Sequence, residues 1–128
     1  MPHFIVEYSS NLEGHHDLRA LSDLIAKTAI DTGVFPLGGI RVRLYPSEIY
    51  TIADGHPENG FVSILVRMGA GRTEEVKKAA GQAVFDAVAG FFSHALEGGY
   101  FMLSLDVQEN EAAFSFKKNG VHGRLKRQ

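Results

Sequence analysis

The apolar residues of this chain switch from a period of two to a helical period and back, and they do so twice. In the first half, residues 4–8 alternate between core-type and other side chains, residues 18–33 carry apolar side chains at helical spacing, and residues 40–44 alternate again. A period of two is typical of a strand, and a period of about 3.6 is typical of a helix. The first half therefore predicts a strand, a helix and a returning strand, joined as a right-handed β-α-β unit.

The second half repeats this plan. Residues 61–66 are almost continuously apolar, which is typical of a strand buried on both faces, and an apolar helical stripe follows over residues 76–96. Gly81 and Gly90 lie within this stripe. Because glycine costs about 1 kcal/mol relative to alanine inside a helix, they predict close packing of the helix on the sheet. Residues 100–107 complete the unit as a last strand.

Between the two halves, residues 48–53 predict a short extra strand, and residues 54–60 hold the densest cluster of turn-forming residues. The whole chain predicts an α+β fold, in which tandem β-α-β repeats give a four-stranded sheet with two helices on one face. Two helices cover only one face, although residues 61–66 are apolar on both. We therefore expect another subunit to cover the second face.

The same pattern sets the boundaries that we expect. The 128 residues form one domain, with a first repeat over about residues 2–55 and a second repeat over about residues 60–108. A C-terminal tail covers residues 109–128, and we expect its last residues, 125–128, to be frayed.

Charge and composition exclude several classes of protein. A formal net charge of −2 argues against a protein that binds nucleic acid along its phosphates. No apolar run approaches the ~20 residues of a membrane span, and the N-terminus lacks a signal-type segment, so we expect a cytoplasmic protein without a membrane partner. The chain has no cysteine, and its 6 histidines lack the spacing of metal ligands. We therefore expect no disulfide, no thiol nucleophile and no metal site.

Pro2, directly behind Met1, opens the first predicted strand. Removal of Met1 would turn its nitrogen into a secondary amine that the proline ring holds rigidly. Free α-amino groups titrate near pH ~8, and burial or nearby cations lower that pKa, so this amine could act as a general base near neutral pH. The alternative is that Pro2 only stiffens the strand.

Three arginines could bind an anion. Arg41 and Arg43 share the polar face of the strand over residues 40–44, from which they could pair with carboxylates, although a solvated strand face is the alternative. Arg72 precedes the second helix, whose N-terminus favours anions, but the segment lacks the Gly-Lys-Ser/Thr ending of a nucleotide-binding loop. A base combined with cations suits a proton transfer on an anionic enol.

Several short segments occur in an order that is far more specific than Met-Pro alone. They are Met1-Pro2-His3-Phe4-Ile5-Val6-Glu7, Phe35-Pro36-Leu37-Gly38-Gly39-Ile40-Arg41, Ala53-Asp54-Gly55, Gly69-Ala70-Gly71-Arg72, and Phe116-Lys117 with Asn119 and Val121-His122. They resemble the 5-carboxymethyl-2-hydroxymuconate Δ-isomerases of the tautomerase superfamily, over nearly the whole chain. The resemblance implies a tautomerase-like fold and a homotrimer whose sheets pack inward.

The resemblance also implies an activity. Members of this family isomerise 5-carboxymethyl-2-hydroxymuconate to its 2-oxo-3-ene isomer in the catabolism of aromatic compounds, without a metal or organic cofactor. By this resemblance Pro2, once it is the first residue, is the general base that moves the proton from the 2-hydroxyl group to C5. Arg41 and Arg72 are catalytic and, with Arg43 and Phe35, bind the small anionic carboxylate substrate.

Val62 occupies the place where the shorter tautomerases begin, and because it is internal and not proline, each chain is expected to carry one base. Alternatives to this assignment remain open. One is a tautomerase of another 2-hydroxydienoate or of a phenylpyruvate-type enol. Another is a non-catalytic trimeric ligand-binding protein, and a third is a ferredoxin-like regulatory domain with the same order of elements.

Overall fold

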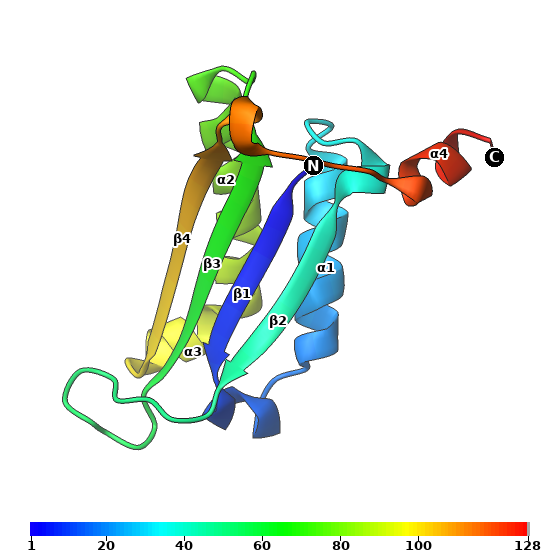
Figure 1. Ribbon diagram of the computed structural model, residues 1–128. Helices are drawn as coiled ribbons and strands as arrows, with labels where there is room; N and C mark the ends of the chain where they lie inside the picture. The colour runs from blue at the N-terminus through cyan, green and yellow to red at the C-terminus, as the bar shows by residue number, and fades with distance from the viewer. Residues whose placement is uncertain (128) are drawn as a thin grey trace.

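The structure is a computed structural model that describes residues 1–127. Its main elements follow the predicted order of strand, helix and strand in each half (Figure 1). They are β1 (His3–Ser9), α1 (Leu18–Asp31), β2 (Arg41–Ser47), β3 (Gly60–Gly69), α2 (Glu74–Phe91) and β4 (Phe101–Asn110). The shorter elements are the 3₁₀ turns η1 (Ser10–Gly14), η2 (Leu37–Gly39) and η3 (Ala112–Phe114), and the helices α3 (Ser93–Gly98) and α4 (Gly120–Lys126).

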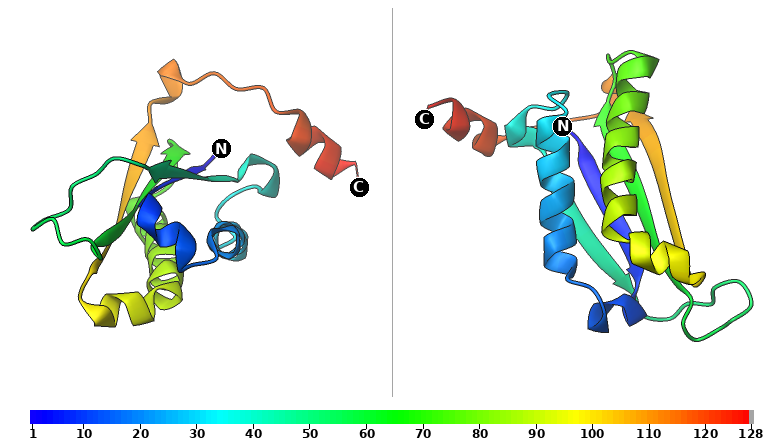
Figure 2. Two further views of the ribbon diagram at one scale, coloured as in Figure 1. Left: turned by 90° about the horizontal axis from the view of Figure 1, so that it is seen from below. Right: turned by 180° about the vertical axis from the view of Figure 1, so that it is seen from behind.

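The four strands form one mixed sheet in the order β2-β1-β3-β4. Each half contributes a parallel pair, β1 with β2 and β3 with β4, and the two halves join through the antiparallel pair of β1 and β3. The long helices α1 and α2 cover the same face of this sheet (Figure 2). The predicted fold class is therefore confirmed.

The core lies between the sheet and the two long helices. Alternate residues of β1 and β3 point into it, because successive side chains of a strand face opposite sides. The core residues are at most 8 % exposed and include Phe4, Val6, Val62, Ile64 and Val66 from the sheet, Leu21 and Ile25 from α1, and Val84 and Val88 from α2.

The second helix is shorter than its apolar stripe predicts. It ends at Phe91, and a separate short helix, α3, follows, so the expectation of one helix over residues 76–96 is wrong. Phe92 leaves the helical conformation with φ −103° and ψ 18°. Its ring is 1 % exposed and stacks on the ring of Phe101 in β4 at 4.5 Å, so packing on the sheet accompanies the break.

The predicted extra strand over residues 48–53 is also wrong. The strand β2 continues through Pro46 to Ser47, which an edge strand tolerates because one side of its backbone is unpaired. The following loop is closed by its own contacts instead of a strand ladder. The side-chain nitrogen of Asn59 donates hydrogen bonds to the carbonyl oxygen of Ile52 at 3.0 Å and to Oδ1 of Asp54 at 2.8 Å.

One of the two helical glycines packs as predicted. A Cβ on Gly81 would lie 2.9 Å from Cγ2 of Val107 in β4, so α2 approaches the sheet more closely than alanine would allow. A Cβ on Gly90 would meet nothing within 4 Å, so close packing does not explain that glycine.

The face of the sheet opposite the helices is uncovered in the single chain. Residues of β3 on this face, among them Phe61 and Leu65, are half-buried, so the strand is not fully buried on both faces within one chain. Tyr45 of β2 and Met102 of β4 share this face through their pairing partners, and they are 52 % and 51 % exposed.

After β4, the chain runs past the N-terminus to α4, which packs beside η2 (Figure 1). Gly38 permits this contact, because a Cβ there would lie 2.7 Å from Cα of His122. The expectation of a frayed end is wrong for residues 125 and 126, which belong to α4, and residue 128 lies outside the described part. No helix within residues 1–127 is long and apolar enough to cross a membrane.

Candidate active site

Three strand ends meet beside the N-terminus. Parallel pairing sets Arg41 opposite His3, and antiparallel pairing sets Arg67 opposite the same residue. Pro2 precedes β1, and its side chain is less than 2 % exposed. Its carbonyl oxygen accepts a hydrogen bond from the backbone N–H of Arg41 at 3.4 Å. The sheet therefore holds Pro2 in a buried position next to basic side chains.

The side chain of Arg41 contacts the backbone at the start of the chain. Its Nε donates a hydrogen bond to the carbonyl oxygen of Gly39 at 3.2 Å, and its Nη2 donates one to the carbonyl oxygen of Met1 at 3.3 Å. A Cβ on Gly39 would lie 3.3 Å from Cα of Met1, so glycine lets the first residue sit close against η2. Arg41 is thus directed at the backbone that precedes Pro2.

The side chain of Arg72 is positioned by Phe35. Its guanidinium carbon lies 5.1 Å from the centre of the Phe35 ring, in cation–π geometry, and its Nη2 donates a hydrogen bond to the carbonyl oxygen of Val34 at 3.4 Å. The Phe35 ring is itself held edge-on against Phe4 of β1, with centroids 5.7 Å apart. The junction before α2 is thereby connected to the strand that carries Pro2.

The N-terminal amine lies in a field of positive charge. Partial burial, and then the charges of Lys117, Arg72 and Arg41, lower the pKa of the Met1 amine. Burial and like charges both favour the neutral form of an amine. The surroundings of the N-terminus therefore keep an amine there available as a proton acceptor.

Arg43 lies one strand step from Arg41 and binds His3. Its Nη1 lies 3.0 Å from Nδ1 of His3. Because a guanidinium only donates hydrogen bonds, Nδ1 is the acceptor, and this assigns the ring proton to Nε2. Burial, followed by the charges of Arg41, Arg67, Arg43 and the N-terminal amine, lowers the pKa of His3 to about 4. His3 is therefore neutral at pH ~7.

A cavity of about 380 Å³ opens beside the N-terminus. Its basic wall comes from β2, β3 and the tail, and no aspartate or glutamate lines it among the residues that the structure describes. The lining residues are Met1, His3, Arg41, Arg67, Asn110, Phe114, Ser115, Phe116 and Lys117. A cavity with this lining suits an anion.

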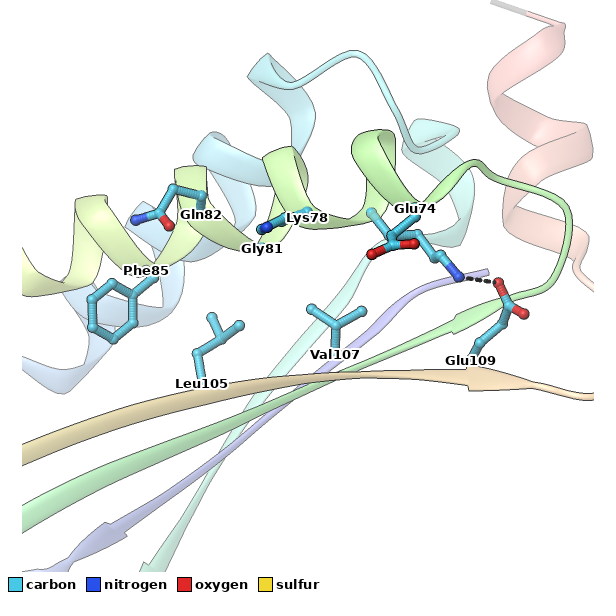
Figure 3. Close-up of a pocket in the computed structure, with 9 residues that line it drawn as sticks. Glu74, Lys78, Gly81, Gln82, Phe85, Leu105, Val107 and Glu109 are labelled. Carbon is cyan, nitrogen blue, oxygen red and sulfur yellow. Dashed lines mark hydrogen bonds and ion pairs between the residues drawn. The ribbon is translucent and has the colours of Figure 1, made fainter.

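A second cavity, of about 550 Å³, lies between α2 and β4 (Figure 3). Leu105 and Val107 extend from β4 toward α2, and Nζ of Lys77 pairs with Oε2 of Glu109 at 2.9 Å. None of the site residues predicted from the sequence lines this cavity. This cavity therefore gives no support to the predicted site, whereas the N-terminal cavity is lined by Met1 and Arg41.

Of the predicted site residues, Arg41 lines the N-terminal cavity, whereas Pro2, Phe35, Arg43 and Arg72 are not among its lining residues. Arg41 and Arg72 both act on the N-terminal amine next to Pro2, and Phe35 holds Arg72. Arg43 is placed apart from them, on His3. The part of the chain that the structure describes holds no cluster of three or more His, Asp or Glu residues able to bind a metal ion.

Sequence reasoning did not single out Arg67, and it named Lys117 and Asn119 only as part of the family resemblance, without a role in the site. Alternation along β3 places Arg67 on the uncovered face, but only the antiparallel pairing of β1 with β3 sets it beside His3. Asn119 caps α4 and donates hydrogen bonds to the carbonyl oxygen of Gly38 at 2.7 Å and to Sδ of Met1 at 3.1 Å. No local pattern in the sequence of the tail indicates this contact.

Comparisons with known proteins agree with this arrangement. Residues 2–125 match the family described as 5-carboxymethyl-2-hydroxymuconate isomerase. The 5-carboxymethyl-2-hydroxymuconate Delta-isomerase of Escherichia coli is 36 % identical over 126 residues, which cover 98 % of this chain and 100 % of that protein.

Solved structures give the same result. A 5-carboxymethyl-2-hydroxymuconate isomerase from Deinococcus radiodurans R1 superposes with a TM-score of 0.88 at 35 % identity, covering 97 % of this chain and 93 % of that chain. A more distant structure, described as the Q0 fused 4-OT wild type symmetric trimer, has a TM-score of 0.60 at 22 % identity, covers 84 % of this chain and 85 % of that chain, and shares the fold. This chain belongs to the 5-carboxymethyl-2-hydroxymuconate isomerase family.

Proposed function

We propose that this protein isomerises 5-carboxymethyl-2-hydroxymuconate to its 2-oxo-3-ene isomer, with the nitrogen of Pro2 as the base after removal of Met1. The family match supports the reaction. The observation that carries the mechanism concerns the amine of Met1, one residue before Pro2. Its pKa is lowered by burial and then by the charges of Lys117, Arg72 and Arg41.

The proton transfer needs one base that takes and returns the same proton. The neutral amine of Pro2 removes the proton of the 2-hydroxyl group, and the O–H electron pair forms the C2=O bond. The C2=C3 electrons then form C3=C4, and the C4=C5 electrons take the proton back from Pro2 at C5. Negative charge develops on the 2-oxygen in between, and preorganised cations stabilise such a charge.

Arg41 and Arg72 are the cations that the proposal assigns to the substrate. In the structure Arg41 donates a hydrogen bond to the carbonyl oxygen of Met1. Removal of Met1 frees this donor beside the new amine, where an oxygen of the substrate can take the place of that carbonyl. Arg72, held over Phe35, approaches the amine from the side of α2.

We also propose a homotrimer in which the uncovered sheet faces pack inward, and a cytoplasmic role in the catabolism of aromatic compounds. The exposed apolar side chains of Tyr45 and Met102 on that face support the assembly. The fold is shared with a structure described as a trimer. Light scattering coupled to gel filtration would return three times the mass of the chain, and a monomer or dimer would contradict the assembly.

The reaction is tested by the initial rate with 5-carboxymethyl-2-hydroxymuconate, followed by ultraviolet absorbance, on protein whose intact mass shows that Met1 is absent. Pro2→Ala should lower kcat/KM by about 100-fold or more, because it replaces the rigid secondary amine that serves as the base. No turnover above the uncatalysed rate by the processed protein would contradict the substrate assignment.

A further inference from the structure

Two cations of the N-terminal cavity have no contact with the substrate in the proton transfer described above. Arg67 comes from the end of β3, opposite His3. Lys117 comes from the tail, between η3 and α4. Both line the cavity of about 380 Å³ together with Met1 and Arg41.

These cations lack a neutralising partner. Among residues 1–127, neither Arg67 nor Lys117 forms an ion pair with an acidic side chain, and Arg41 and Arg43 form none either. The Nε of Arg67 is buried and has no hydrogen-bond partner in the described structure. A buried donor of this kind is expected to have an acceptor, and a carboxylate bound in the cavity would supply one.

The tail is anchored on both sides of Lys117. It leaves β4, which is paired along its length with β3, and it reaches α4, which packs on η2. Asn119 fixes the far side, because its Nδ2 donates to the carbonyl oxygen of Gly38 and its Oδ1 accepts from the backbone N–H of His122. The backbone around Lys117 is therefore fixed beside the cavity that Lys117 lines, and its charge lowers the pKa of the N-terminal amine.

The proposed substrate carries one more carboxylate than Arg41 and Arg72 account for. Muconate is a dicarboxylate, and the carboxymethyl group adds a third carboxylate on C5. Since C5 receives the proton from Pro2, this third group must lie beside the N-terminus. The cavity wall of Arg67 and Lys117 is the basic surface available there among the residues that the structure describes.

We propose that Arg67 and Lys117 form a carboxylate-binding subsite for the carboxymethyl group, and that this subsite selects a tricarboxylate enol over a dicarboxylate one. The inference rests on the proposed function for the identity of the substrate. The subsite itself is a property of the cavity, so its ligand preference can be measured without turnover.

The binding test uses two inert ligands that differ by one carboxylate, tricarballylate and glutarate, measured by calorimetry on protein without Met1. Lys117→Met and Arg67→Met should each weaken tricarballylate binding about tenfold and leave glutarate binding within about twofold, because each removes a charge-assisted contact to the third carboxylate. Lys118→Met is the matched control, since Lys118 is the exposed neighbour that does not line the cavity. It should change neither affinity.

A kinetic test separates this inference from the proposed function. Lys117→Met should raise KM for 5-carboxymethyl-2-hydroxymuconate about tenfold and leave KM for 2-hydroxymuconate, which lacks the carboxymethyl group, nearly unchanged. Failure of the wild type to turn over either compound would contradict the proposed function, and calorimetry would still decide on the subsite.

Three outcomes would overturn the subsite. One is that Lys117→Met weakens the binding of tricarballylate and of glutarate equally, and another is that it weakens the binding of neither. The third outcome combines two results. The trimer dissociates in Arg67→Met and stays intact in Arg67→Lys, and tricarballylate binds to both variants as it does to the wild type. Arg67 would then pair with a carboxylate of another subunit and not with the ligand. Because Lys117 is exposed in the tail, its variant tests the subsite even if Arg67→Met fails to fold.

Discussion

Arg41 donates a hydrogen bond to the carbonyl oxygen of Met1 at 3.3 Å. Met1 therefore engages the guanidinium that the proposal assigns to the substrate. A retained Met1 therefore interferes with the proposed catalysis in two ways. It makes the nitrogen of Pro2 an amide, which has no useful basicity, and it engages the guanidinium of Arg41.

Activity is expected to follow the fraction of protein that lacks Met1. A preparation that retains Met1 should have kcat/KM at least about 100-fold below that of processed protein, because the base is absent. Treatment with a methionine aminopeptidase should restore the rate in proportion to the processed fraction, which intact mass reports. Full activity of the unprocessed form would show that Pro2 is not the base.

Arg41 and Arg43 offer a matched pair, since they lie two residues apart on one face of β2 but have different partners. Arg41→Met should lower kcat/KM by about 100-fold, the cost of removing one preorganised donor at a developing negative charge. Arg43→Met should lower it less than about tenfold, because Arg43 binds His3 and not the residue before Pro2. Steady-state kinetics would contradict this assignment if the two variants lost activity equally.

Phe35 and Arg72 are expected to be coupled energetically. The guanidinium of Arg72 lies 5.1 Å from the Phe35 ring, a contact worth about 0.5–1 kcal/mol in partly exposed settings. A double-mutant cycle with Phe35→Leu and Arg72→Met, measured by urea unfolding, should return a coupling free energy of that size. Additive effects of the two substitutions would mean that the ring does not hold the arginine.

His3 should make the fold less stable in weak acid. Its pKa is lowered from 6.5 to about 4 in the folded protein, so between these values the unfolded chain binds a proton that the folded chain does not. Its contribution to stability is therefore complete above pH ~6.5 and is lost as the pH falls toward ~4.

His3→Gln removes this titration. The free energy of unfolding of the variant should fall less between pH ~7 and pH ~5 than that of the wild type, measured by urea titration at each pH. His94→Gln, on the exposed surface of α3, is the control for loss of a histidine elsewhere. If the free energy of unfolding of His3→Gln depended on pH as that of the wild type does, His3 would not be the cause of the loss of stability in acid.

Local pattern was enough to predict much of the fold. Alternation and helical spacing gave the two β-α-β units, and Gly81 was recognised as a close contact with the sheet. The break at Phe92 was missed, because it accompanies stacking on Phe101 of a strand that follows later in the chain. The loop over residues 48–53 was missed because its hydrogen bonds come from Asn59.

The candidate site was predictable where its chemistry lies in short motifs. Pro2, Arg41 and Arg72 were predicted in this way, and the charges of both arginines lower the pKa of the N-terminal amine. Arg67 was not found, since its place beside His3 depends on the pairing of strands from different halves. Lys117 was assigned no role, because its position depends on the contact of Asn119 with Gly38, far along the chain.

The state of the Pro2 nitrogen is the quantity that tests the proposed mechanism most directly. Processed protein labelled with ¹⁵N-proline can be titrated by NMR, and the pKa of the amine can be compared with the pH dependence of kcat/KM. The account predicts a pKa below the ~8 of a free α-amino group. It also predicts that kcat/KM rises with pH through that same pKa and then levels off, because only the neutral amine accepts the proton. An amine that stays protonated throughout the pH range of full activity would contradict the account.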